Sequence, residues 1–119
     1  MRLGGPLFET YETPDEWVAT VNAHGYRATF CPVGRDAPGD EIRAYASAAR
    51  EHDILIAETG AWSNPLSPNH EERAAALETC KRGLALADEI GAGCCVNISG
   101  SRGNKWYGPC PDDLSEETF

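Results

Sequence analysis

The sequence predicts an α/β fold in which parallel strands are joined by helices. Short apolar segments alternate with longer segments whose apolar residues recur at helical spacing, in the order β-α-β-α-β-α-β. The segment ILIAE, residues 54–58, is almost continuously apolar, as expected for a strand covered on both faces of a parallel sheet. Two architectures fit this pattern: a small open doubly wound sheet, and the N-terminal half of a TIM (β/α)8 barrel. A whole barrel takes about 250 residues, so about four strands and three complete helices in residues 1–119 favour one partial barrel domain.

The first unit has a strong helix start. Residues 2–5 form a short possible strand, and TPDE then supplies Thr13 as N-cap, Pro14 at the first helical position and Glu16 to close a capping box. Gly25 suits a left-handed C-terminal cap. The apolar stripe of this helix consists of Trp17, Val18 and Val21.

The next two units follow the same alternation. We expect a strand over 26–32, a helix from about Asp40 to His52 and a strand over 54–58. The longest helix should cover about 69–90, and GAG then ends it before a fourth strand over 94–99. The buried face of the shorter helix should consist of Ile42, Ala46 and Ala49. In the longer helix, Ser67 is the expected cap and Pro68 a residue of the first turn. Its buried face should consist of Leu77, Cys80, Leu84, Ala87 and either Gly83 or Ile90.

The last eight residues, DDLSEETF, read as the start of a fourth helix. Ser115 is a good N-cap, and Glu116 and Glu117 would place negative charge at the positive end of the helix dipole. Leu114 and Phe119 have the spacing of a hydrophobic staple. We therefore expect the domain to continue past residue 119 in a longer parent protein.

Charge and composition exclude several classes of partner. The net charge of −9 argues against a broad nucleic-acid interface, which needs clustered Lys and Arg. No apolar segment approaches the ~20 residues of a membrane span, and the N-terminus lacks the apolar core of a signal peptide. We expect a cytoplasmic protein that binds neither nucleic acid nor membrane.

The five cysteines do not form a recognisable metal or disulfide pattern. No C-x-x-C occurs, and Cys94 and Cys95 would point to opposite faces of a strand. We interpret the cysteines mainly as small buried residues in a reducing compartment.

Several segments together resemble the sugar phosphate isomerase/epimerase family, the xylose isomerase-like TIM barrels. The third strand ends in Glu58 followed by Gly60 and Trp62, and an Asn64-Pro65 loop comes next. The long helix ends LADEIGA, the fourth strand ends VNISGS, and WYGPCPDDLSEETF looks like the family's fourth loop and the start of its fourth helix.

This resemblance implies a metal-assisted isomerisation or epimerisation of a sugar or related polyol. Members of the family hold a divalent metal (Mn, Mg, Co or Zn) through Glu, Asp, His and Glu side chains, typically from strands five to eight. No metal ligand is therefore assigned to this half. We expect no metal to bind it and no turnover by the 119-residue chain alone.

Candidate substrate-binding residues sit at the predicted C-terminal ends of strands, where barrel sites form. Glu58 could bond sugar hydroxyls or move a proton, with Ile54 and Ile56 filling the barrel interior below it; the alternative is a carboxylate bonded to backbone amides of the next turn. Asn97 and Ser99 share one strand face by alternation, and would bind a polyol or satisfy loop backbone groups.

The loops supply two further candidates. Trp62 and Trp106 could form an apolar wall against a sugar ring, or simply pack their loops. Arg102 and Lys105 flank Gly103 in GSRGNK and could hold an anion such as phosphate, although the loop matches no established phosphate motif and a solvated loop is the alternative.

Other classes of function remain open. His24, His52 and His70 fall on helix ends, so the strand-end histidines of the related apurinic-site endonucleases have no counterpart here. A non-catalytic half barrel could form homo-oligomers through exposed sheet edges. A small α/β binding module complete in itself is the third alternative.

Overall fold

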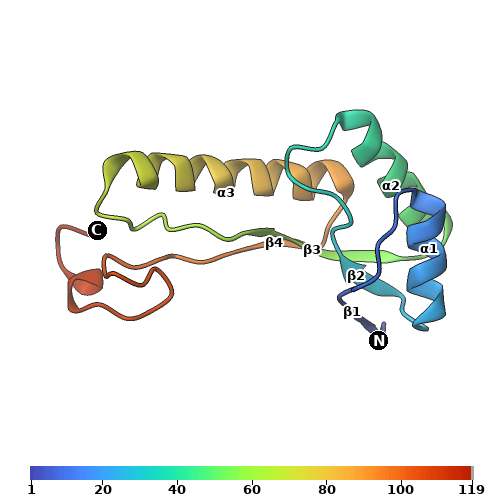
Figure 1. Ribbon diagram of the computed structural model, residues 1–119, viewed down its shortest axis with the longest axis horizontal. Coiled ribbons are helices and arrows are strands. Elements are labelled where there is room, and N and C mark those ends of the chain that lie inside the picture. Colours follow the sequence, from blue (N-terminus) through green and yellow to red (C-terminus); the bar gives the residue numbers. More distant parts are fainter. Residues whose placement is uncertain (119) are drawn as a thin grey trace. The chain divides into compact units, whose positions relative to one another are not determined.

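The computed structural model describes residues 1–118 and shows a parallel α/β arrangement (Figure 1). Within these residues, four parallel strands form one sheet in the order β1-β2-β3-β4, the order of consecutive strands in half of a β/α barrel. The predicted α/β class is therefore confirmed. The elements are β1 (Gly4–Gly5), α1 (Pro14–Ala23), β2 (Ala28–Phe30), α2 (Gly39–Glu51), β3 (Leu55–Ala61), α3 (His70–Ile90), β4 (Cys94–Asn97) and a short 3-10 helix, η1 (Pro111–Leu114).

The chain divides into two compact units. Unit 1 comprises Met1–Thr59 and Leu84–Cys95. Unit 2 comprises Gly60–Gly83 and the described residues from Val96 onward.

The hydrophobic core of unit 1 lies between its helices and one face of its strands. Trp17 is completely buried, and its ring meets that of Tyr45 edge to face, with the ring centroids 5.7 Å apart. Ile56 of β3 and Leu86 and Ile90 of α3 belong to the same cluster. The sheet's other face is less covered, since Phe30 and Leu55 stay exposed.

Helix α1 begins and ends as the sequence predicts. The Thr13 hydroxyl accepts a hydrogen bond from the amide of Glu16, and the Glu16 carboxylate accepts one from the amide of Glu12. The reciprocal bond of the capping box thus reaches one residue further back than predicted. Gly25 follows the helix with a φ of +67°, the left-handed conformation that glycine adopts without strain.

Strand β3 is longer than predicted and contains an irregularity. It pairs in parallel with β2, but the register shifts between Thr29, which lies opposite Ile56, and Phe30, which lies opposite Glu58. The extra residue changes the alternation of side chains. Ile54 and Ile56 are buried before the shift, whereas Thr59 and Ala61 are buried after it.

The predicted buried stripe of α3 is partly wrong. Leu77 and Leu84 are 47% and 59% exposed. In unit 1 the buried positions of α3 are Leu86, Ala87 and Ile90, and in unit 2 Ala76 and Gly83 are buried. The small residues on this stripe permit close packing of the helix backbone, which leaves the two leucines on outer positions.

Two predicted helix starts are also corrected. Asn69, and not Ser67, caps α3, because its Oδ1 accepts hydrogen bonds from the amides of Glu71 and Glu72. After η1, Ser115 has extended backbone angles and its hydroxyl donates to the carbonyl of Asp112. The described residues 115–118 form a turn and no helix. Leu114 is exposed, and the predicted staple partner, Phe119, lies outside the described residues.

No helix in residues 1–118 combines the length and the apolar character that crossing a membrane requires.

Two leucines of α3 test the assignment of the core. Leu86→Ala should lower the free energy of unfolding by about 2–5 kcal/mol, because it opens a cavity in a packed cluster. Leu84→Ala, two residues earlier in the same helix, should change it by less than about 0.5 kcal/mol, because its side chain is exposed. Urea unfolding followed by circular dichroism measures both values. Equal losses for the two variants would contradict the assigned packing.

Candidate functional site

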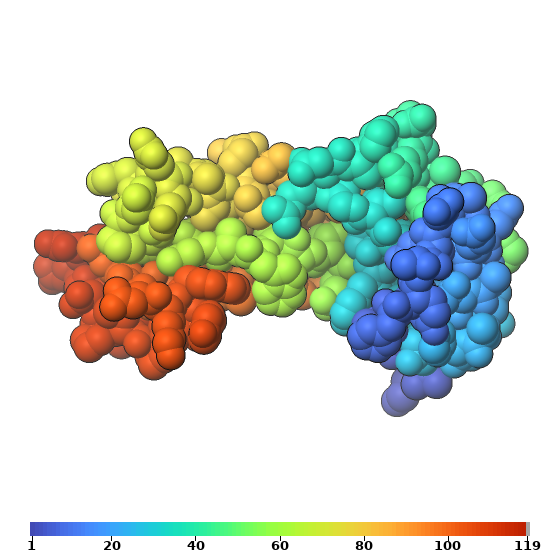
Figure 2. Space-filling view, in the orientation of Figure 1, coloured from blue at the N-terminus to red at the C-terminus, as the bar shows by residue number. Residues whose placement is uncertain are grey.

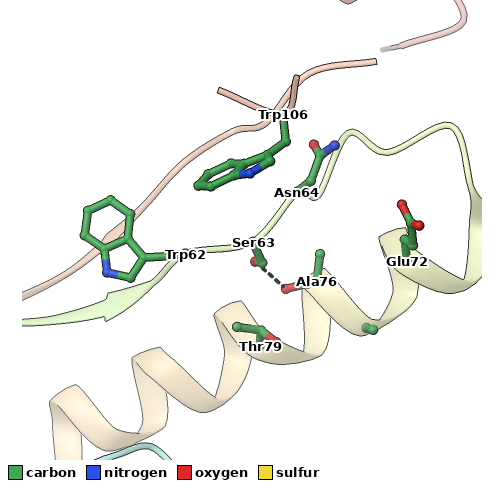
Figure 3. A pocket seen from close by; sticks show the side chains of 8 residues that line it. Trp62, Ser63, Asn64, Glu72, Ala76, Thr79 and Trp106 are labelled. Carbon is green, nitrogen blue, oxygen red and sulfur yellow. Dashed lines mark hydrogen bonds between the residues drawn. The ribbon is translucent and has the colours of Figure 1, made fainter. Parts of the chain in front are cut away.

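Unit 2 contains an open cavity of about 420 Å³, within the size range of small-molecule sites. Its walls come from the segment after β3, from one side of α3 and from the long loop after β4. Figure 3 shows Ser63 directed toward α3, with the Trp106 ring lying between Trp62 and Asn64 in this view. The lining residues are Trp62, Ser63, Asn64, Glu72, Ala75, Ala76, Thr79 and Trp106.

Asn64 holds the two loops of unit 2 together. Its Nδ2 donates to the carbonyl of Ser101, and its Oδ1 accepts from the amide of the same residue, both at 2.9 Å. Gly100 has a φ of +89°, and a Cβ there would collide with the Asn64 side chain. Figure 2 shows the loop residues beyond 98, in orange and red, massed beside the yellow-green segment that follows β3.

Short hydrogen bonds orient the cavity wall on the α3 side. The Ser63 hydroxyl donates to the carbonyl of Ala76 at 3.2 Å. The buried Ser67 hydroxyl donates to Glu72 Oε2 at 2.8 Å and accepts from the amide of Asn69. Glu72 is therefore held by one carboxylate oxygen, which leaves Oε1 without a partner among the described residues.

The two tryptophans of the cavity present much of their surface to solvent. Trp62 is 57% exposed and Trp106 is 36% exposed. The Trp106 ring meets Tyr107 edge to face, with centroids 5.6 Å apart. This contact supports the loop-packing role considered for Trp106, and the ring also lines the cavity. Large exposed indoles that share a cavity with polar groups offer an apolar surface beside hydrogen-bonding groups.

The carboxylate of Asp113 organises the loop that contains GSRGNK. It accepts hydrogen bonds from the amide of Arg102 at 2.6 Å, from the amide of Cys110 at 2.9 Å and from the Ser101 hydroxyl at 2.9 Å. These bonds, led by that from the Arg102 amide, hold the pKa of Asp113 below its usual value, against a smaller opposing effect of desolvation. The Arg102 guanidinium lies 3.7 Å from Glu117.

The remaining predicted site residues do not line this cavity. Glu58 lies inside β3, so its predicted position at the strand end is wrong, and the alternative of a carboxylate bonded to a turn directly after it is wrong as well. Ile54 and Ile56 pack in the core with the helices instead of filling a barrel interior below it. The register shift interrupts the regular alternation of side chains between Ile56 and Glu58.

Asn97 and Ser99 do not share a strand face, because β4 ends at Asn97. The Asn97 Nδ2 lies 3.7 Å from the Cys80 sulfur, on the side of the strand that faces α3. Ser99 is exposed in the loop that follows. Lys105 is also exposed, and no hydrogen bond or ion pair of its side chain is found within residues 1–118.

None of the cysteines and histidines is among the residues that line the cavity. All five cysteines are free, four are only half-buried and Cys94 is exposed, so the prediction that they are small buried residues is wrong. Burial raises the pKa of the half-buried Cys31 thiol, which lies 3.4 Å from the carbonyl of Val33. His24 pairs with Glu9 at 2.9 Å and stacks on Tyr26.

The described residues do not fit the divalent metal that the resemblance implies. Nowhere in residues 1–118 do three or more His, Cys, Asp or Glu side chains come together as a metal would require. Glu72, the carboxylate of the cavity, has Ser67 as its neighbour and no second acidic group among the lining residues. No catalytic step is assigned to a metal on these residues.

Sequence reasoning found Trp62 and Trp106 but missed several of their neighbours. Glu72 and Thr79 lie on the long helix, where nothing local in the sequence marks a cavity wall. Asn64 had a signal, because an Asn-Pro pair after a strand indicates a turn-forming side chain. Asp113 was given no role of its own, since it only precedes the predicted cap Ser115.

Comparisons with family models, with curated proteins and with solved structures gave no match. The resemblance to sugar phosphate isomerases and epimerases therefore stays a prediction.

The Asp113 network predicts a specific response to pH. Because its pKa is lowered in the folded chain, the ionised carboxylate stabilises the loop above the usual Asp pKa. That contribution is lost as the pH falls through the lowered value.

We expect Asp113→Asn to accelerate hydrogen exchange at the amides of Arg102 and Cys110. Asp112→Asn is the control, because the Asp112 carboxylate accepts none of these bonds. Unchanged protection in Asp113→Asn would contradict this role.

Proposed function

We propose that the cavity of unit 2 binds a small sugar or polyol, and that the chain is the N-terminal half of a sugar isomerase or epimerase-like barrel. The observation that carries the proposal is the presence of two exposed indoles in one cavity with Glu72 and Thr79. The parallel order of the four strands supports the barrel architecture.

The chemistry of the cavity suits a polyhydroxylated ring. The C–H face of a sugar is apolar and packs on an indole, whereas its hydroxyl groups need hydrogen-bond partners around the edge. Glu72 Oε1 can accept hydrogen bonds from hydroxyl groups, and charge-assisted bonds of this kind are stronger than neutral ones. The Thr79 hydroxyl can both donate and accept.

The described residues would contribute binding and orientation. Asn64 is held in one orientation by its two hydrogen bonds to Ser101, so it shapes the cavity wall. In the proposed whole protein a metal would polarise the substrate oxygens, and residues outside this chain would supply its ligands. The role of this half is to hold the sugar in place.

Sugar binding to the chain tests the proposal. Saturation-transfer NMR with D-xylose, D-fructose and D-ribose should show saturable binding of at least one sugar. Trp62→Ala or Trp106→Ala should raise the dissociation constant about tenfold, the equivalent of about 1.4 kcal/mol. Circular dichroism confirms that each variant is folded.

Phe8→Ala is the matched control, because Phe8 is an exposed aromatic side chain in unit 1 that does not line the cavity. It should bind as the original chain does. Absence of saturable binding by all three sugars, or equal binding by the tryptophan variants, would refute the proposal.

A further inference from the structure

We infer that this cavity selects uncharged sugars and excludes their phosphate esters, with Glu72 and Asp113 as the specificity-determining residues. The inference rests on the proposed sugar site and names its substrate class. It follows from the charges that line the cavity and from the partners that the anion-binding groups of the loop already have.

The cavity itself carries negative charge. Among the described residues that line it, Glu72 is the charged one. Ser67 holds one oxygen of Glu72 in place, and the Glu72 side chain is part of the cavity lining (Figure 3). A phosphate ester carries close to two negative charges at neutral pH, so it would meet a like charge that Ser67 holds in place.

A second cavity of about 330 Å³ adjoins the first, with Asn64, Glu72 and Trp106 common to both. It is lined in addition by Arg102, Gly103 and Asn104 of the GSRGNK loop. This is the place where the phosphate of a sugar ester would have to lie. Its loop has the glycines and the arginine that a phosphate site uses.

Three donors of this loop, at Ser101, Arg102 and Gly103, are already occupied by the chain's own groups, whereas the Lys105 ammonium group is exposed. The Arg102 amide and the Ser101 hydroxyl donate to Asp113, and the Gly103 amide donates to the Ser101 oxygen. The Cys110 amide also donates to Asp113. The Asp113 carboxylate thus takes the position of an internal anion, and a phosphate could bind these amides only by displacing it.

The nearby guanidinium is also paired. Arg102 lies 3.7 Å from Glu117, and its side chain is mostly buried. A phosphate would have to compete with both Glu117 and Asp113 for the same positive charge and the same amides. An uncharged hydroxyl group meets none of this repulsion and gains an acceptor in Glu72.

Matched pairs of ligands test the inference: D-fructose against D-fructose 6-phosphate, and D-ribose against D-ribose 5-phosphate. At constant ionic strength, saturation-transfer NMR should give a dissociation constant at least tenfold lower for the free sugar than for its ester. A phosphate ester that binds as tightly as the free sugar, or more tightly, overturns the inference and leaves the proposed sugar site standing. No binding by either member of each pair overturns both.

Variants then locate the discrimination. Glu72→Gln should lower the dissociation constant of the phosphate ester. The difference in dissociation constant between the ester and the free sugar should therefore narrow severalfold. Glu71→Gln, the neighbouring acid that lines neither cavity, should leave the difference unchanged. Asp113→Asn should let inorganic phosphate bind to the freed amides, read from chemical-shift changes at Arg102 and Cys110. If Glu71→Gln narrows the difference as much as Glu72→Gln, general charge is responsible and the assignment to Glu72 fails.

Discussion

The cavity of unit 2 depends on the paired hydrogen bonds between the Asn64 side chain and the backbone of Ser101. These two bonds tie the segment after β3 to the loop after β4, at positions 37 residues apart in the chain. Each neutral hydrogen bond contributes about 1 kcal/mol, and the pair also fixes the geometry because both ends of one amide are engaged. They keep the loop of Trp106 beside the segment of Ser63, so that both line one cavity.

Asp113 supports the same loop from the other side. One carboxylate satisfies two backbone amides and one hydroxyl, so the loop needs neither a regular element nor a bound ion to stay ordered. This arrangement affects which groups the loop can bind. The loop resembles an anion site in sequence, yet its donors point to an acid that the chain itself supplies.

The positions of the helices and strands were predicted more accurately than the side of each element that is buried. The start of α1 was predictable because Thr13, Pro14 and Glu16 act locally, and the parallel direction of the strands follows from the alternation of elements. The exposure of Leu77 and Leu84 was not predictable, because the alanine-rich helix offers two apolar stripes and only packing decides between them. The register shift in β3 also has no local signal, and it changes the alternation on which the interpretation of Glu58 relied. Trp62 and Trp106 were found because they follow the ends of strands and their rings could pack on a sugar, whereas Glu72 and Asp113 became visible only through their tertiary contacts.

The central claim is that Trp62 and Trp106 receive the apolar face of a sugar in one cavity. Intermolecular nuclear Overhauser effects between a bound sugar and the indole protons of the chain test it most directly. The chain has three tryptophans, and Trp17 is completely buried, so the signals of Trp62 and Trp106 can be distinguished from it. We predict contacts from the C–H protons of the sugar to both exposed indoles and none to Trp17. Saturable sugar binding without contacts to either exposed indole would contradict the account.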